Sequence, residues 1–200
     1  MDRRHLLRGL AQGALLAAAG GALVGCGKTS FHAVDITGAD YARGFSLPDH
    51  NGRLRTLKDF DGRVVVLFFG YTQCPDVCPT SMLELAEARR LLGGEGDRLQ
   101  GLFITLDPER DTPEILKAYM TNFDPGFLAL IPPLAELPAL AKDFKVFYRK
   151  VEGPTPTSYT MDHSAGSYVF DPRGRVRLYT RHAGGADKLA ADVRLLLQGR

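Results

Sequence analysis

The sequence lacks an excess of charge of one sign. Its 200 residues include 25 lysines and arginines and 23 aspartates and glutamates. Residues 1–25 hold three arginines and one aspartate, so the rest of the chain has 22 basic and 22 acidic side chains. A protein that binds a phosphate backbone normally concentrates positive charge on one surface. The neutral remainder therefore argues against nucleic-acid binding.

The sequence also lacks an apolar run of the roughly 20 residues that a membrane-spanning helix needs. The mostly apolar stretch 10–24 is shorter and contains three glycines, and it follows the basic residues Arg3, Arg4 and Arg8. This layout predicts a signal peptide over residues 1–25, with a transmembrane anchor as the alternative. The Arg3-Arg4 pair also resembles a twin-arginine export signal.

Cysteine is scarce, with three in the whole chain. Cys26 follows Leu23-Val24-Gly25, a pattern similar to the bacterial lipobox, in which the cysteine sulfur carries a diacylglycerol and becomes the new N-terminus. Such a lipid holds a protein at a membrane without spanning it. We therefore expect an exported, membrane-anchored lipoprotein that faces the periplasm or another extracytoplasmic space. Cys74 and Cys78 are then two cysteines in a compartment where disulfides can form.

Hydrophobic periodicity divides the chain after residue 42 into alternating strands and helices. Residues 26–42 are polar and mixed, which predicts a lipidated tether, and residues 43–200 form the predicted domain. The expected elements are a hairpin at 44–54, strands at 64–69, 99–106, 127–131, 146–151, 167–170 and 176–179, and helices at 79–92, 112–122, 134–144 and 186–197. This order predicts an α/β, thioredoxin-like fold: a central mixed sheet flanked by helices, with an N-terminal β-hairpin.

Cys74 and Cys78 lie where a buried strand ends and a helix begins. The helix dipole favours a thiolate at this position. Thiolates suit monovalent copper, and the three intervening residues let the two sulfurs bind one ion or form a local disulfide. The alternative to a functional cysteine pair is a purely structural disulfide, but such a bond would close a very short loop and would therefore stabilise the fold weakly.

Histidine is the natural third ligand for a copper site with two thiolates. Four of the five histidines are expected to leave with the signal peptide or to be solvated on the surface: His5, His32, His50 and His182. His163 differs because it precedes the predicted strand 167–170, in a loop that a thioredoxin-like fold brings beside the cysteine loop. The residues alone leave open whether His163 is a ligand or a hydrogen-bonded loop residue.

Three segments carry a family resemblance: GYTQCPDVCP at 70–79, LDPERDTP at 106–113 and DHS at 162–164. In this order they resemble the Sco/SenC family of copper chaperones, and the resemblance spans roughly residues 45–197. It implies that Cys74, Cys78 and His163 bind copper, as Cu(I) and also as Cu(II). It further implies a role at the dinuclear copper site of cytochrome c oxidase subunit II, with an upstream copper donor and a thiol reductant as additional partners.

Two functions stay open for the cysteine pair. A metallochaperone would deliver copper to the oxidase site, whereas a thiol:disulfide oxidoreductase would use Cys74 and Cys78 as redox-active residues to reduce the cysteines of that site. The C-x-x-x-C spacing, and His163 where such reductases have a proline, favour the metal. A peroxidase of the peroxiredoxin type would share the fold, but Thr72 lies two rather than three residues before Cys74.

Three aspartates are candidates for supporting roles. Asp107 ends a strand near the expected site, where it can orient a ligand, dock a partner or serve only in the turn that starts the next helix. Asp76 and Asp162 flank the expected ligands and can either hydrogen-bond them or be solvated.

Overall fold

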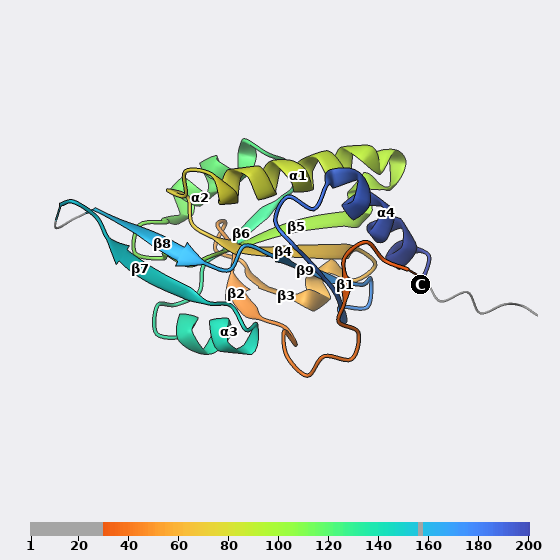
Figure 1. The fold of residues 1–200 in the computed structure, drawn as a ribbon, viewed down its shortest axis with the longest axis horizontal. Coiled ribbons are helices and arrows are strands. Elements are labelled where there is room, and N and C mark those ends of the chain that lie inside the picture. Colours follow the sequence, from red (N-terminus) through yellow and green to blue (C-terminus); the bar gives the residue numbers. More distant parts are fainter. Residues whose placement is uncertain (1–29, 156–157) are drawn as a thin grey trace, which may run out of the picture. The chain divides into compact units, whose positions relative to one another are not determined.

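A six-stranded mixed sheet forms the centre of the computed structural model, which describes residues 30–155 and 158–200 (Figure 1). The strand order is β1-β10-β9-β4-β5-β6, in which β4, β5 and β6 run parallel and the other neighbours pair antiparallel. The strands are β1 (Val34–Asp35), β4 (Val64–Gly70), β5 (Leu99–Thr105), β6 (Leu128–Leu130), β9 (Ser167–Phe170) and β10 (Val176–Thr180). The expected α/β, thioredoxin-like arrangement with a mixed sheet is confirmed.

Strand β4 separates two hydrophobic cores. All seven of its residues are buried, because both faces of the sheet are covered. Val64, Val66 and Phe68 pack in the core beneath α1 (Val77–Leu91), α2 (Pro113–Thr121) and α4 (Ala186–Leu197). The alternate residues of β4 pack against α3 (Leu137–Asp143) and the 3-10 helix η1 (Leu57–Phe60) on the other face. A second 3-10 helix, η2 (Gly93–Arg98), leads from α1 into β5.

Helix α1 begins at Val77, two residues earlier than the sequence predicted. Pro79 is compatible with this start because it lies in the first turn, where a helix needs no backbone donor. Cys78 therefore belongs to the first turn of α1, and Cys74 lies in the short loop between β4 and that turn.

A β-hairpin extends beyond the central sheet (Figure 1). It consists of β7 (Tyr148–Glu152) and β8 (Tyr159–His163), paired antiparallel from Tyr148 opposite His163 to Glu152 opposite Tyr159. The sequence predicted a strand near β7 but a loop around His163, and the loop prediction was wrong. Strand β8 alternates half-buried and exposed residues, but its polar composition conceals this pattern.

The hairpin predicted near residue 50 is confirmed as β2 (Ser46–Pro48) and β3 (Leu54–Thr56), with Gly52 at φ +78° in the turn. The turn bonds to the edge strand β6, where the His50 backbone N–H donates to Ala129 O at 2.9 Å and the Ala129 N–H donates to His50 Nδ1 at 3.1 Å. His50 is thus half-buried and hydrogen-bonded, which corrects the expectation of a solvated side chain. The contact also covers an otherwise open sheet edge.

The folded unit begins at Phe31. Strand β1 pairs with β10, and buried Asp192 of α4 accepts the backbone N–H groups of His32 and Ala33 at 2.9 and 2.8 Å. Residues 31–42 of the predicted tether are therefore part of this unit. The predicted signal peptide and Cys26 lie outside the described residues. Among the residues described, no helix is both long and apolar enough to cross a bilayer.

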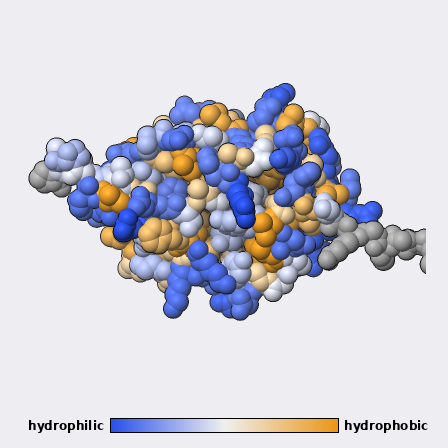
Figure 2. Space-filling view, viewed as in Figure 1, coloured by the Kyte–Doolittle hydropathy of each residue, from blue (hydrophilic) through white to orange (hydrophobic). Residues whose placement is uncertain are grey.

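The visible face of the protein carries hydrophilic and hydrophobic residues interspersed (Figure 2). Several large apolar side chains are exposed singly, including Leu54, Leu83 and Phe147. Scattered exposure of this kind is normal for a folded domain.

Candidate metal site

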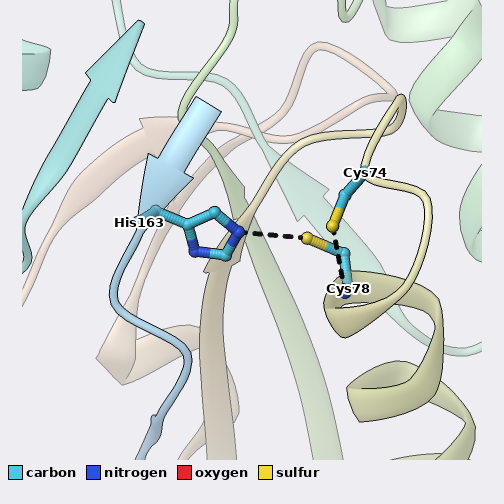
Figure 3. A group of neighbouring side chains, drawn as sticks. All are labelled: Cys74, Cys78 and His163. Carbon is cyan, nitrogen blue, oxygen red and sulfur yellow. Dashed lines mark hydrogen bonds between the residues drawn. The ribbon is translucent and has the colours of Figure 1, made fainter. Parts of the chain in front are cut away.

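A loop, the first turn of α1 and the β7–β8 hairpin bring Cys74, Cys78 and His163 together (Figure 3). The Nε2 atom of His163 lies 3.4 Å from Sγ of Cys78, and the potential ligand atoms of all three residues lie within 4.8 Å of one another. Sulfur and nitrogen ligands sit about 2.0–2.3 Å from a transition-metal ion, so two ligands of one ion are at most about 4.6 Å apart. The three side chains therefore form a group that can hold a metal ion with only a slight adjustment.

Cys74 is the thiolate of the pair. Its hydrogen bond with the Cys78 thiol, together with backbone N–H groups of Asp76 and Cys78, lowers the pKa of Cys74 to about 4 against the opposing effect of burial. The Cys78 N–H lies 3.4 Å from Cys74 Sγ, in the first turn of α1. The helix N-terminus thus stabilises negative charge on the first cysteine of the motif.

Cys78 retains its proton. The hydrogen bond to Cys74 and then burial raise the pKa of the Cys78 thiol well above its ordinary value. The side chain is fully buried, whereas Cys74 is half-exposed, and neither forms a disulfide within the part of the chain that the structure describes. The two sulfurs therefore differ in charge and in access to solvent.

The ring of His163 is held in one orientation by a backbone hydrogen bond. Its Nδ1 lies 2.8 Å from the carbonyl oxygen of Ser164. A carbonyl oxygen only accepts hydrogen bonds, so Nδ1 carries a proton, and Nε2, which faces Cys78, is the nitrogen available to ligate a metal. Such a bond on the far nitrogen is how proteins usually orient a histidine that ligates a metal.

Aromatic rings and a glycine enclose the site. Phe68 and Tyr71 pack edge-on to the His163 ring, with centroid distances of 6.0 and 5.9 Å. At Gly70, a Cβ atom would lie 2.8 Å from Cys78 Sγ and equally close to Phe68. From the sequence, Gly70 followed a strand and began the 70–79 motif with no role of its own, but its missing side chain is what lets β4 approach the sulfur.

A buried carboxylate holds the loop that leads to the cysteines. Asp111 is 1% exposed and accepts the backbone N–H and the hydroxyl of Thr72, as well as the hydroxyl of Thr105. Burial raises the pKa of Asp111. Asp111 lies within the 106–113 motif, but the sequence alone assigned it no role, because its hydrogen-bond partners Thr72 and Thr105 lie 39 and 6 residues away.

The three aspartates singled out from the sequence have other partners. Asp107 is buried and accepts hydrogen bonds from Arg110 Nε and from the Tyr159 hydroxyl. Asp76 and Asp162 are exposed, and their carboxylates bond to the Thr80 hydroxyl and the Arg149 guanidinium respectively. The contact of Asp76 with Cys74 is made by its backbone N–H.

The remaining described histidines lie outside the cluster. His50 bonds to the edge strand, His182 Nδ1 lies 3.0 Å from the Ser81 hydroxyl, and His32 is exposed near the N-terminal end of the folded unit. His182 is half-buried, which again corrects the expectation of a solvated residue. His163 is therefore the histidine that the fold brings to the cysteines.

The sequence matches the SCO1/SenC family model over residues 34–198. An SCO2-like protein of Rickettsia felis is 36% identical over 139 residues, which cover 69% of this chain. The same match covers 66% of the Rickettsia protein, so the chain spans slightly less than two thirds of that relative's length.

Solved structures show the same fold at similar identity. ScoI of Bradyrhizobium japonicum with copper bound superposes with a TM-score of 0.70 at 38% identity, covering 76% of this chain and 97% of the other. The apo Sco1 protein of Thermus thermophilus superposes with a TM-score of 0.74 at 35% identity, covering 85% and 99%. The mixed sheet and its flanking helices are thus shared with these two proteins.

Proposed function

Because the chain belongs to the SCO1/SenC family, we propose that it is a metallochaperone that binds copper through Cys74, Cys78 and His163. The observation that carries this proposal is the convergence of two sulfurs and one imidazole nitrogen to within 4.8 Å, on segments far apart in the chain. Thiolate and imidazole are ligands that suit copper. The copper-bound state of a relative with 38% identity supports the same metal.

The protonation states of the site define what copper loading requires. Cys74 already carries a negative charge because its pKa is lowered to about 4, and His163 directs Nε2 toward the sulfurs. Cys78 must give up its proton when the ion enters, so loading releases a proton and becomes more favourable as pH rises. Oxidation to a Cys74–Cys78 disulfide would block loading, and a reductant that keeps both thiols free is therefore an implied partner.

We propose cytochrome c oxidase subunit II as the recipient and an upstream copper donor as the source. Family membership supports this partnership. The half-exposed Cys74 is the ligand that an incoming thiolate can reach first, while Cys78 stays buried. Copper would then pass by stepwise exchange of ligands.

We propose that the protein acts at the outer face of a membrane, held by a lipid on Cys26 after removal of residues 1–25. The lipobox-like segment before Cys26 and the apolar run 10–24 support this location. Metabolic labelling with a palmitate analogue tests it directly. Label on the native chain that disappears in Cys26→Ala is expected, and equal labelling of both would reject the lipid anchor.

A second function is favoured by the asymmetry of the cysteine pair. A half-exposed thiolate next to a buried protonated thiol is the arrangement of a thiol reductant. Cys74 would attack a partner disulfide and form a mixed disulfide, releasing one partner thiolate. Deprotonated Cys78 would then displace the second partner thiolate, leaving a Cys74–Cys78 disulfide and a reduced partner.

Copper titration of the full-length protein tests the binding site. In a Cys26→Ser background the only cysteines are Cys74 and Cys78. Anaerobic titration of the reduced protein with Cu(I) should show one tightly bound ion per chain. Cys74→Ser and Cys78→Ser should each abolish tight binding, and His163→Ala should weaken it. Undiminished binding by all three variants would reject the site.

A transfer experiment separates the chaperone from the reductase. The copper-loaded and the reduced metal-free protein are mixed in turn with the oxidised and the reduced copper domain of an oxidase subunit II. Copper transfer to the reduced domain supports the chaperone. Rapid thiol–disulfide exchange with the oxidised domain, with no copper transfer in any mixture, would favour the reductase.

A further inference from the structure

We infer that Arg110 is a positioning residue: it clamps the hairpin that carries His163 to the loop that carries Cys74. This inference rests on the proposed copper function for its consequence, but the clamp itself is a property of the metal-free protein. Arg110 lies in the turn between β5 and α2, outside both segments that it joins.

The guanidinium of Arg110 contacts three separate segments. Nη1 donates to the backbone carbonyl of Tyr159, at the start of β8, at 2.9 Å. The same nitrogen donates to Oε1 of Gln73, the residue before Cys74, at 3.1 Å. Nε donates to the carboxylate of Asp107, which fixes the guanidinium relative to the end of β5. One planar cation thus connects the sheet, the cysteine loop and the hairpin.

The clamp is sheltered and stacked. The guanidinium carbon lies 3.4 Å from the centroid of the Tyr159 ring, and the Tyr159 hydroxyl donates to the second oxygen of Asp107 at 2.8 Å. The side chains of Arg110 and Asp107 are 18% and 2% exposed. Nη2 of Arg110 is buried without a hydrogen-bond partner among the described residues, so this nitrogen gains nothing from polar contacts. Stacking on the Tyr159 ring, with a longer contact to the Tyr71 ring at 6.0 Å, offsets this cost.

The hairpin needs such a clamp because the central sheet does not hold it. Among the described residues, strand β8 pairs with β7 alone, in a two-stranded sheet separate from the six-stranded one. Three half-buried residues at alternate positions of β8 contact the site. The Tyr159 carbonyl accepts a hydrogen bond from Arg110, the Met161 backbone is hydrogen-bonded to Tyr71, and His163 lies against Cys78. Arg110 holds the end of β8 that is farthest from the ligand.

Removing the clamp should release His163 without touching a ligand. A hairpin free to move would no longer hold Nε2 opposite the two sulfurs, so the imidazole would have to be ordered when copper binds. Residues that orient metal ligands typically change metal affinity by about 10- to 100-fold when mutated. We expect Arg110→Ala to lose copper affinity within this range and to approach the affinity of His163→Ala.

The matched control is Arg149→Ala. Arg149 lies in the hairpin itself, on β7, and pairs with exposed Asp162, so this variant removes an arginine side chain next to β8 without touching the clamp. Arg110→Lys keeps the positive charge but loses the planar fork, and Tyr159→Phe removes only the hydroxyl bond to Asp107. If geometry matters more than charge, Arg110→Lys should lose nearly as much copper affinity as Arg110→Ala. Tyr159→Phe should lose less copper affinity than either.

The test combines hydrogen exchange, copper affinity and paramagnetic resonance on the full-length protein in the Cys26→Ser background. In the reduced metal-free state, the backbone amides of β8 should exchange at least about tenfold faster in Arg110→Ala, and remain unchanged in Arg149→Ala. In the Cu(II) form, nitrogen hyperfine coupling from His163 should weaken or disappear. Because both changes act through His163, Arg110→Ala should add little further loss of Cu(I) affinity to His163→Ala.

Two outcomes would overturn the inference: unchanged exchange of β8 with full nitrogen coupling in Arg110→Ala, or independent, additive losses from Arg110→Ala and His163→Ala. If Arg110→Ala does not fold, an Arg110→Lys variant with normal exchange and normal coupling would overturn it as well. Failure of the unmodified protein to bind copper would reject the proposed function, whereas the exchange experiment would still show whether Arg110 holds the hairpin.

Discussion

The Sγ atom of Cys74 accepts the backbone N–H of Cys78 at the start of α1. A side-chain oxygen of the residue preceding a helix usually makes this bond, but the Asp76 side chain makes no capping bond here. The sulfur takes over the capping position, and the helix N-terminus becomes part of the electrostatic environment of the site. This one hydrogen bond therefore gives a backbone N–H at the helix N-terminus its partner, and it also stabilises the thiolate of Cys74.

The first prediction concerns the reactivity of Cys74. Since its pKa is lowered to about 4, Cys74 is charged at pH 5–7, where an ordinary thiol is almost wholly protonated. Alkylation of the reduced Cys26→Ser protein with iodoacetamide should rise with a midpoint near pH 4 and level off by about pH 6. Peptide mass spectrometry should find the label on Cys74, with Cys78 modified slowly throughout.

The Cys78→Ala variant is the control for this titration. The hydrogen bond with Cys78 is the largest cause of the lowered pKa of Cys74, so the midpoint should move upward in the variant. A midpoint near pH 8–9 in the unmodified protein, or preferential labelling of Cys78, would contradict the assigned protonation states.

The second prediction concerns Gly70. The Cβ of Gly70→Ala would lie 2.8 Å from Cys78 Sγ and 2.9 Å from Phe103, so these groups must move. Overpacking of this kind typically costs about 1–3 kcal/mol of folding free energy. Urea unfolding should show that loss, and copper affinity should fall because a ligand sulfur is displaced. Gly94→Ala is the control, since a Cβ there meets nothing within 4 Å; an equal loss in both variants would refute the steric argument.

The third prediction is a pH dependence that originates at His50. Burial is the largest cause lowering the pKa of His50, against the neighbouring Asp49 carboxylate, which raises it. The unfolded chain therefore binds a proton more readily than the folded protein, and stability is lost as pH falls below about 6.5. His50→Asn keeps a hydrogen-bond acceptor but does not titrate. Between pH 7.5 and 5, the unfolding free energy of the unmodified protein should fall relative to that variant, and a constant difference would contradict the prediction.

The fourth prediction tests where the folded unit begins. Asp192→Ala removes the acceptor for the backbone N–H groups of His32 and Ala33, which should cost about 1–3 kcal/mol. Amide exchange at these two residues should accelerate, while copper binding stays unchanged. Asp40→Ala, an exposed aspartate in the same N-terminal stretch, should stay within about 0.5 kcal/mol of the unmodified protein. Equal stability of both variants would place this stretch outside the folded unit.

Local patterns were enough to predict most of the central sheet. The apolar run of β4 and the periodicity of α4 each lie within a single segment, and both were located to within a residue. The start of α1 was misplaced by two residues, since Pro79 permits either start. Strand β8 was missed because its exposed positions and polar residues do not form an apolar run.

Contacts between distant segments were not visible in the sequence. Arg110 bonds to Gln73 and Tyr159, which are 37 and 49 residues away, and nothing in the local pattern connects them. The hydrogen bonds of Asp192 to the N-terminal segment cross about 160 residues, so the local sequence pattern predicts a tether there. His163 could be predicted near the cysteines only because the expected fold and the family resemblance indicated which distant segments lie together.

X-ray absorption at the copper edge, measured on the reduced Cys26→Ser protein loaded with one equivalent of Cu(I), tests the copper site most directly. Two sulfur scatterers and one imidazole nitrogen are predicted, with the nitrogen contribution lost in His163→Ala and one sulfur lost from the weakly held copper of Cys74→Ser. A spectrum without sulfur scatterers, or one that is identical in all three proteins, would contradict copper binding by these side chains.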